Sequence, residues 1–314
     1  MKIALVLLSV IGFTLPSLAH NGHHSHGPSS ATATNEVEIT TTSEKRIIES
    51  NGIPNHSTGQ FPGRGNPHEI SVQFVRYEIP LTPREADKPI DARGYALGVA
   101  LNGVKIDVAT AEFWNNQRGS IWNEEAIVNG KGRLGLDGNN AHVQPTGAYH
   151  YHGVPNGLIE ELGGEGKMVQ VGWAADGYPI YGPWAYSDPM DPNSEIVEMK
   201  PSYRLKTGTR PGGNTGPGGR YNGMYTADFE YAEGLGDLDE SNGRIGITPE
   251  FPQGTYYYVL TNSFPYVPRY FHGIPDRSFR MHGGGDGGPH RGHPGMFGSA
   301  GRFGRPPPPP QFRR

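Results

Sequence analysis

The sequence predicts a single, mainly β domain with long loops and few short helices, built as a β-sandwich or an irregular barrel. Short apolar runs rich in Val, Ile, Tyr and Phe alternate with polar residues, the pattern typical of strands. Turn-forming residues separate these runs, with 47 Gly and 29 Pro among 314 residues. Long stretches rich in Ala, Leu, Glu and Lys are missing from the sequence, which argues against a helical bundle or a coiled coil.

The alternating runs place the expected strands along the chain. They cover residues 36–41, 70–79, 95–101, 168–173 and 255–261. Only residues 123–128 and a few similar pieces have a composition that suits a helix. A doubly wound α/β sheet needs helices of about 10–15 residues between its strands, and the sequence contains none, so we exclude that class.

The first 19 residues have the pattern of a secretory signal peptide. Lys2 supplies the positive charge, residues 3–15 form an apolar run, and the small residues Ser17 and Ala19 precede the expected cleavage point. The apolar run is too short to cross about 30 Å of hydrocarbon as a helix. We therefore expect a secreted or periplasmic mature protein without a transmembrane segment.

Composition divides the mature chain into three parts. Residues 20–35 are rich in His, Ser and Thr and are expected to form a disordered linker. The β domain is expected at residues 36–280. Residues 281–314, rich in Gly, His, Pro and Arg, are expected to form a disordered tail.

Charge, cysteine content and motifs exclude several function classes. The net charge is −4, but the tail from residue 281 carries +4 and Lys2 carries +1, so residues 20–280 carry −9. Such an acidic body argues against binding to nucleic acid. The chain has no cysteine, so thiol nucleophiles, cysteine zinc sites and iron–sulfur clusters are impossible. P-loop and Rossmann glycine patterns are absent, and we expect no nucleotide cofactor.

A histidine cluster is the most distinctive feature of the body. His142, His150 and His152 are the three histidines of residues 69–271. On a strand, His150 and His152 point to one face while the neighbouring tyrosines point to the other. A Gln-Pro-Thr-Gly turn would fold the segment into a hairpin and bring His142 to the same face. Three neutral imidazoles with an open position suit Zn²⁺ or copper, where a bound ion could activate water or oxygen.

Two aspartates could complete this site. Asp137 and Asp176 are candidates for a fourth ligand, or for acceptors that orient a histidine. A His-x-His pair on a strand can also be a hydrogen-bonded aromatic pair in a sheet, and this structural interpretation stays open. The clustering of the three histidines favours the metal.

Two further groups of residues allow other interpretations. After cleavage, His20 would carry the free amine and could help to chelate copper, although a flexible tail that binds metal weakly is the simpler interpretation. A run of aromatic residues on Gly/Pro loops could stack on a ligand or could fill the core: Trp173, Tyr178, Tyr181 and Trp184. The sequence therefore leaves a second function open, a non-enzymatic extracellular module that binds glycan or protein. A structural surface protein whose ends make the contacts is a third.

The chain resembles the YHYH domain family. The segment Gly-Ala-Tyr-His-Tyr-His-Gly at residues 147–153 is similar to the motif that names the family. Further similar segments lie at residues 50–56, 98–103, 111–114, 134–144, 174–182 and 236–240. The resemblance covers roughly residues 48–280. It implies an exported, mostly bacterial domain, and it implies no particular reaction.

Overall fold

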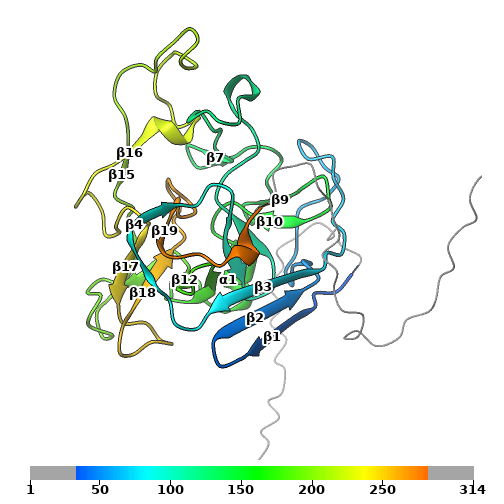
Figure 1. Cartoon of the computed structure of the whole chain (residues 1–314), viewed down its shortest axis with the longest axis vertical. Helices are drawn as coiled ribbons and strands as arrows, with labels where there is room; N and C mark the ends of the chain where they lie inside the picture. The colour runs from blue at the N-terminus through cyan, green and yellow to red at the C-terminus, as the bar shows by residue number, and fades with distance from the viewer. Residues whose placement is uncertain (1–32, 282–314) are drawn as a thin grey trace, which may run out of the picture.

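An eight-stranded mixed sheet forms the centre of the computed structural model, which describes residues 33–281 (Figure 1). The sheet curls into a half-barrel. In sheet order its strands are β17 (Gly243–Gly246), β18 (Thr255–Val259), β12 (Pro179–Tyr181), β11 (Gln170–Ala174), β5 (Ala96–Ala100), β6 (Lys105–Asp107), β10 (Tyr149–Tyr151) and β9 (Ala141–Val143). Most neighbours are antiparallel, but β6 and β10 run parallel, as do β12 and β18.

Smaller sheets surround this centre. One is the antiparallel sheet of β1 (Val37–Thr41), β2 (Lys45–Ser50) and β3 (Val75–Pro80). Four two-stranded ladders join β4 (Glu85–Asp91) to β19 (Tyr270–Gly273), β7 (Ile127–Val128) to β8 (Lys131–Gly132), β13 (Trp184–Tyr186) to β14 (Ile196–Glu198), and β15 (Tyr203–Leu205) to β16 (Phe229–Tyr231). Figure 1 shows β7, β15 and β16 in a lobe above the central sheet.

Helices are few and short in the described residues. They are α1 (Asn156–Glu161) and the 3-10 turns η1 (Trp114–Asn116), η2 (Thr226–Asp228) and η3 (Arg277–Phe279). The mainly β prediction is therefore confirmed, and the sheet is a partly curled barrel. Between residues 33 and 281 no helix has the length and apolar character to cross a bilayer.

Four of the five expected strands agree with the structure, and the fifth agrees in part. The runs at 36–41, 95–101, 168–173 and 255–261 contain β1, β5, β11 and β18. Of residues 70–79 only the second half is a strand, because the first half hydrogen-bonds to a turn and a loop: Ser71 N donates to Gly147 O, and Gln73 N donates to Asn51 O. The prediction of a helix at residues 123–128 is wrong, since this segment forms isolated β-bridges and then β7.

The ordered body begins before residue 36. The Asn35 amide donates to the carbonyls of Ile53 and Asn102 at 2.5 and 2.8 Å, and Asn51 donates to Thr34 O at 2.8 Å. Residues 33–35 are thus held to the body, although sequence composition assigns them to the linker. The expected signal peptide, the linker up to residue 32 and the tail from residue 282 lie outside the described residues.

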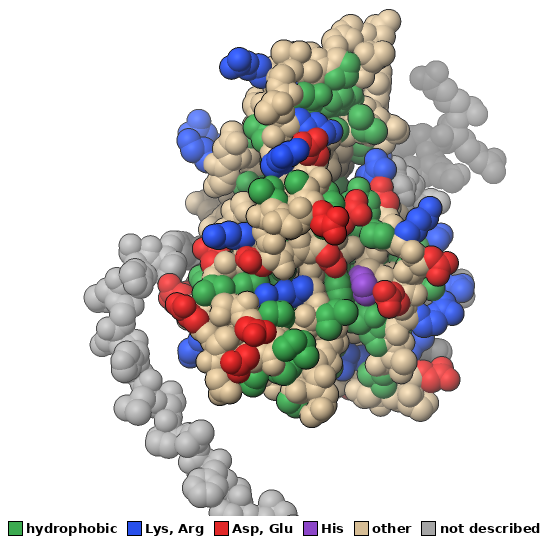
Figure 2. Space-filling model, turned by 90° about the vertical axis from the view of Figure 1, so that its left-hand side faces the viewer, with side chains coloured by type: hydrophobic (Ala, Val, Ile, Leu, Met, Phe, Trp, Pro, Cys, Tyr) green, Lys and Arg blue, Asp and Glu red, His purple; other side chains and the backbone are tan. Residues whose placement is uncertain are grey.

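The main core joins the central sheet to the β1–β3 sheet. Ile48, Ile79, Leu97, Ile106 and Tyr151 are completely buried in it. Two smaller clusters support β12–β14 and the upper lobe. On the face that Figure 2 shows, acidic and basic side chains are interspersed with apolar ones.

Candidate metal centre

One hairpin carries the three histidines of the body. Strands β9 and β10 pair antiparallel, and His142 lies directly opposite His150. The turn between them closes when Gly147 N donates to Gln144 O at 2.8 Å. Gly147 has φ +84°, and a Cβ at this position would lie 1.9 Å from Ser71 Oγ, so only glycine fits. The predicted hairpin is confirmed, and it brings His142 to the face of His150 and His152.

The three imidazoles converge through their Nε2 atoms. His152 Nε2 lies 3.0 Å from His150 Nε2 and 3.2 Å from His142 Nε2. One nitrogen from each of the three rings falls within 4.8 Å of the other two. Two nitrogens bound to one tetrahedral Zn²⁺ at about 2.0–2.1 Å are roughly 3.3 Å apart. The triad therefore has the spacing that a shared metal ion requires.

Backbone carbonyls determine which ring nitrogens carry protons. His142 Nδ1 lies 2.9 Å from Leu134 O, and His150 Nδ1 lies 3.1 Å from Ala148 O. A carbonyl only accepts, so both Nδ1 atoms donate, and in the neutral rings both Nε2 atoms carry lone pairs. A single N–H on His152 Nε2 can satisfy only one of them, whereas a cation satisfies all three. Carbonyls of this kind commonly orient metal-binding histidines.

Burial keeps two of the three imidazoles uncharged. His150 is 2% exposed and His152 is 6% exposed, while His142 is half-buried. Burial lowers the pKa of His150 well below its ordinary value, and Lys105 and His142 lower it further. Burial also lowers the pKa of His152, with His150 and His142 acting in the same direction. Both rings are therefore neutral at pH 7, the form that ligates metal.

Asp107 lies beside the triad, and the sequence did not single it out. Strand β6 runs parallel to β10 with Lys105 opposite His150, so Lys105 and Asp107 share the histidine face. Asp107 Oδ2 lies 3.7 Å from His150 Nε2 and 2.8 Å from Lys105 Nζ. Asp107 Oδ1 is buried and has no hydrogen-bond partner among the described residues. One feature of the sequence could have indicated Asp107: it forms a pair of charged residues with Lys105 in the otherwise apolar run at residues 104–108.

Neither aspartate predicted from the sequence lies at the triad. Asp137 is on the opposite face of β10, where its carboxylate accepts hydrogen bonds from the Tyr149 hydroxyl at 2.7 Å and from Gly59 N at 3.0 Å. Asp176 follows β11, which two strands separate from β10. Its buried carboxylate accepts from the Tyr258 hydroxyl at 2.5 Å and from Gly273 N at 2.8 Å. Each of the two carboxylates therefore accepts hydrogen bonds from a tyrosine hydroxyl and a backbone amide, away from the histidines.

The predicted aromatic set does not gather on one open surface. Tyr181 is completely buried, and its hydroxyl donates to Glu250 and accepts from the Thr248 hydroxyl. Trp173 packs edge-on against Phe251 and lies under the guanidinium of Arg46, whose CZ is 3.5 Å from the ring centroid. Tyr178 packs instead on Tyr256 and His272, and Trp184 is half-buried in β13. The possible role of His20 falls on a residue outside the described range.

Comparisons with known proteins agree with the resemblance seen in the sequence. No curated protein and no solved structure matches the chain. The family model described as YHYH protein matches residues 76–273, more than half of the chain, and this range contains the histidine hairpin and Asp107. The chain belongs to the YHYH protein family.

Proposed function

We propose that this chain is an exported metal-binding protein that holds one Zn²⁺ or Cu²⁺ ion with His142, His150 and His152. The observation that carries the proposal is the convergence of three Nε2 atoms, two of them with their lone pairs directed inward by carbonyls. Imidazole ligands suit both ions. A purely structural cluster of histidines would leave one of these lone pairs facing another nitrogen without a proton between them.

Asp107 is proposed as the fourth ligand of this site. A buried carboxylate oxygen without a hydrogen-bond partner is costly, and a cation nearby would remove that cost. Asp107 Oδ2 already accepts from Lys105 and, at 3.3 Å, from Gln144 Nε2. Oδ1 has no such partner, and we propose it as the oxygen that would bind the ion. Three histidines with Asp107 would form a closed tetrahedral site, whereas three histidines alone would leave an open position for chemistry.

The test compares metal stoichiometry between variants of the full mature chain, because the chain has further histidines outside the described residues. Wild type and His142→Ala are stripped with chelator and titrated with Zn²⁺ and Cu²⁺ by calorimetry. We expect His142→Ala to lose one tight ion per chain, because it removes a half-exposed ligand at little cost in packing. His272→Ala, which removes a histidine away from the triad, should bind as wild type does. Equal stoichiometry in wild type and His142→Ala would refute the proposal.

A second variant distinguishes the two forms of the site. Asp107→Asn keeps the shape of the side chain and removes its charge. If Asp107 is a ligand, the affinity of this variant for Zn²⁺ should fall about 10–100-fold. The three histidines should still bind one ion, more weakly than in wild type. An unchanged affinity would show that Asp107 only pairs with Lys105, and that the site keeps an open position.

Export is tested separately. The small residues Ser17 and Ala19 support cleavage that leaves His20 as the first residue. The intact mass of protein collected from the periplasm or medium should correspond to residues 20–314. Recovery of the chain with residues 1–19 still attached would contradict the proposed cleavage after Ala19.

A further inference from the structure

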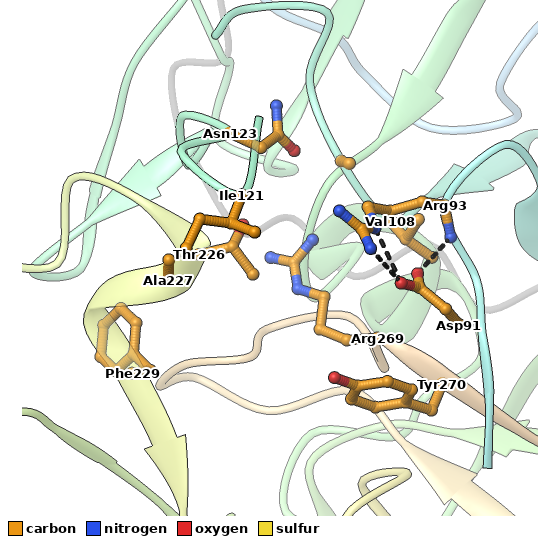
Figure 3. Close-up of a pocket in the computed structure, with 11 residues that line it drawn as sticks. Asp91, Arg93, Val108, Ile121, Asn123, Thr226, Ala227, Phe229, Arg269 and Tyr270 are labelled. Carbon is orange, nitrogen blue, oxygen red and sulfur yellow. Dashed lines mark hydrogen bonds and ion pairs between the residues drawn. The ribbon is translucent and has the colours of Figure 1, made fainter. Parts of the chain in front are cut away.

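A pocket lies between the β4–β19 ladder and the upper lobe. Its volume is about 210 Å³. Asp91, Arg93, Arg269 and Tyr270 line it from the ladder, and Thr226 and Phe229 line it from the lobe (Figure 3). None of these residues belongs to the histidine site.

Two guanidinium groups in this pocket retain unused donors. Arg93 bonds to Asp91 Oδ2 through Nε at 2.8 Å and Nη2 at 2.5 Å. Arg269 uses Nη2 for Glu125 Oε2 at 2.5 Å and for Pro265 O at 3.2 Å. Neither Nη1 has a partner among residues 33–281, and Arg269 Nε is buried without one. Figure 3 shows the Arg269 guanidinium directed into the pocket. The pocket thus offers hydrogen-bond donors that its own acceptors, including the Asp91 carboxylate, leave unused.

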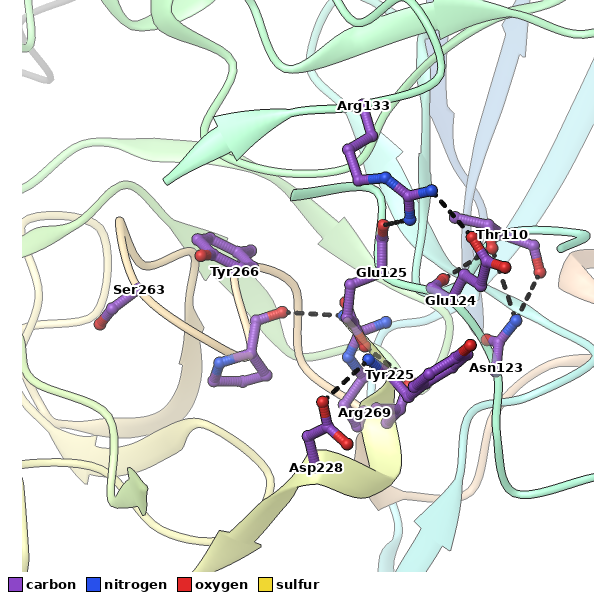
Figure 4. Close-up of polar contacts among 12 residues, drawn as sticks. Thr110, Asn123, Glu124, Glu125, Arg133, Tyr225, Asp228, Ser263, Tyr266 and Arg269 are labelled. Carbon is purple, nitrogen blue, oxygen red and sulfur yellow. Dashed lines mark hydrogen bonds and ion pairs between the residues drawn. The ribbon is translucent and has the colours of Figure 1, made fainter. Parts of the chain in front are cut away.

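A buried network holds Arg269 in this position. Glu125 is 3% exposed and accepts from Thr226 Oγ1 at 2.5 Å as well as from Arg269. Figure 4 shows this pair among the polar contacts that tie residues 110–133 to the chain before β19. Because the guanidinium is fixed before a ligand arrives, binding would cost little side-chain entropy.

Apart from Asn123, the remaining walls are mostly apolar. Val108, Ile121 and Phe229 contribute hydrocarbon surface, and Ile121 is 62% exposed at the rim. Tyr270 presents a hydroxyl that has no hydrogen-bond partner within the described part of the chain. Burial raises the pKa of Tyr270, Asp91 and Glu240 raise it further, and Arg93 and Arg269 oppose the rise, so charges of both signs lie within electrostatic reach of that hydroxyl.

We propose that this pocket binds a small organic monocarboxylate, with its carboxylate on Arg269 and Arg93 and its apolar body against Ile121 and Phe229. Arginine is the side chain best suited to a carboxylate, because its planar donors match two oxygens. Asp91 and Glu125 already neutralise most of the two positive charges. The pocket therefore favours a singly charged acid with an apolar body over a compact, multiply charged anion such as phosphate.

The test titrates benzoate into the full mature chain in the presence of chelator, with binding followed by calorimetry. We expect saturable binding of one benzoate, and at least about tenfold weaker binding of benzamide, which has the same body without the charge. Inorganic phosphate should not compete. Absence of saturable benzoate binding, or equal binding of benzamide, would overturn the proposal.

Variants locate the site. Arg93→Gln removes one donor from an exposed ion pair, which contributes little to stability, and should weaken benzoate binding about tenfold. Arg76→Gln is the matched control, because Arg76 on β3 forms a similar exposed pair with Glu49 on β2, away from the pocket. Arg269→Gln is a poorer probe, since it would leave Glu125 buried without its partner. Equal loss in Arg93→Gln and Arg76→Gln would show that benzoate binds elsewhere.

Discussion

The imidazoles of His150 and His152 are kept neutral by the protein, and this has a cost that depends on pH. Both side chains are buried, and burial is the largest cause of their lowered pKa values. In the unfolded chain both rings would take up protons below about pH 6.5. The unfolded state then binds more protons than the folded state, so the free energy of unfolding falls as the pH falls.

We predict that the metal-free chain loses stability between about pH 6.5 and pH 5. Glu125 and Asp176 act with the opposite sign, because burial raises their pKa values, so the histidine contribution is best isolated by comparison. His150→Gln cannot take up a proton and should show a shallower decrease of its urea midpoint across this range. Parallel curves for wild type and His150→Gln would mean that His150 is protonated equally well in the folded protein.

Strand β10 separates two kinds of buried surface at the scale of a single element. His150, and His152 directly after the strand, lie on the face of Asp107, while Tyr149 and Tyr151 pack against His56 on the other side. The Tyr151 hydroxyl lies 2.6 Å from His56 Nε2, and the Tyr149 hydroxyl donates to Asp137. One face is therefore arranged for a ligand, and the other for packing.

Substitutions on the two faces should have different effects. Tyr149→Ala removes a ring that is 2% exposed and should lower the free energy of unfolding by about 3–5 kcal/mol, with metal stoichiometry retained below the melting temperature. His150→Ala should abolish tight metal binding at a smaller cost in stability. Thermal melts and elemental analysis of both variants check this. Loss of metal in folded Tyr149→Ala would contradict the separation of the faces.

The same strand shows what local sequence can and cannot predict. Alternation and the Gln-Pro-Thr-Gly turn predict the hairpin and the shared face of the histidines, because strand geometry and turn chemistry are properties of neighbouring residues. Asp107 could not be predicted from local sequence, because only the parallel pairing of β6 with β10 brings it close to His150. Residues 123–128 were misjudged for a similar reason. The Asn123 amide bonds to the carbonyls of Thr110 and Glu112, which local propensity does not reveal.

At the scale of the whole molecule, the buried apolar side chains lie between Ile48 and Phe279. Burial of apolar surface is the dominant favourable term in folding. Residues 34 and 35 belong to the same body, since Asn51 donates to Thr34 O and the Asn35 amide bonds to two loop carbonyls. Its other end is held by the bond from Met281 N to Gly94 O.

Trimming should show where the body ends. We expect a chain of residues 33–281 to melt within a few degrees of residues 20–314. A chain of residues 36–281 should melt lower, because Asn51, Ile53 and Asn102 each lose a polar contact with the removed segment. Calorimetric melts of the three chains decide this. A large drop on trimming to 33–281 would show that further residues support the core.

The position of β9 has a kinetic consequence. This strand is an end strand of the eight-stranded sheet, and it carries His142, while the other two histidines belong to the segment next to it. Strands at the margin of a sheet open locally far more often than the whole domain unfolds. An ion held by the triad would then lose one of its ligands each time β9 frays. Its rate of exchange with chelators should follow hydrogen exchange at residues 141–143, and should be faster than global unfolding.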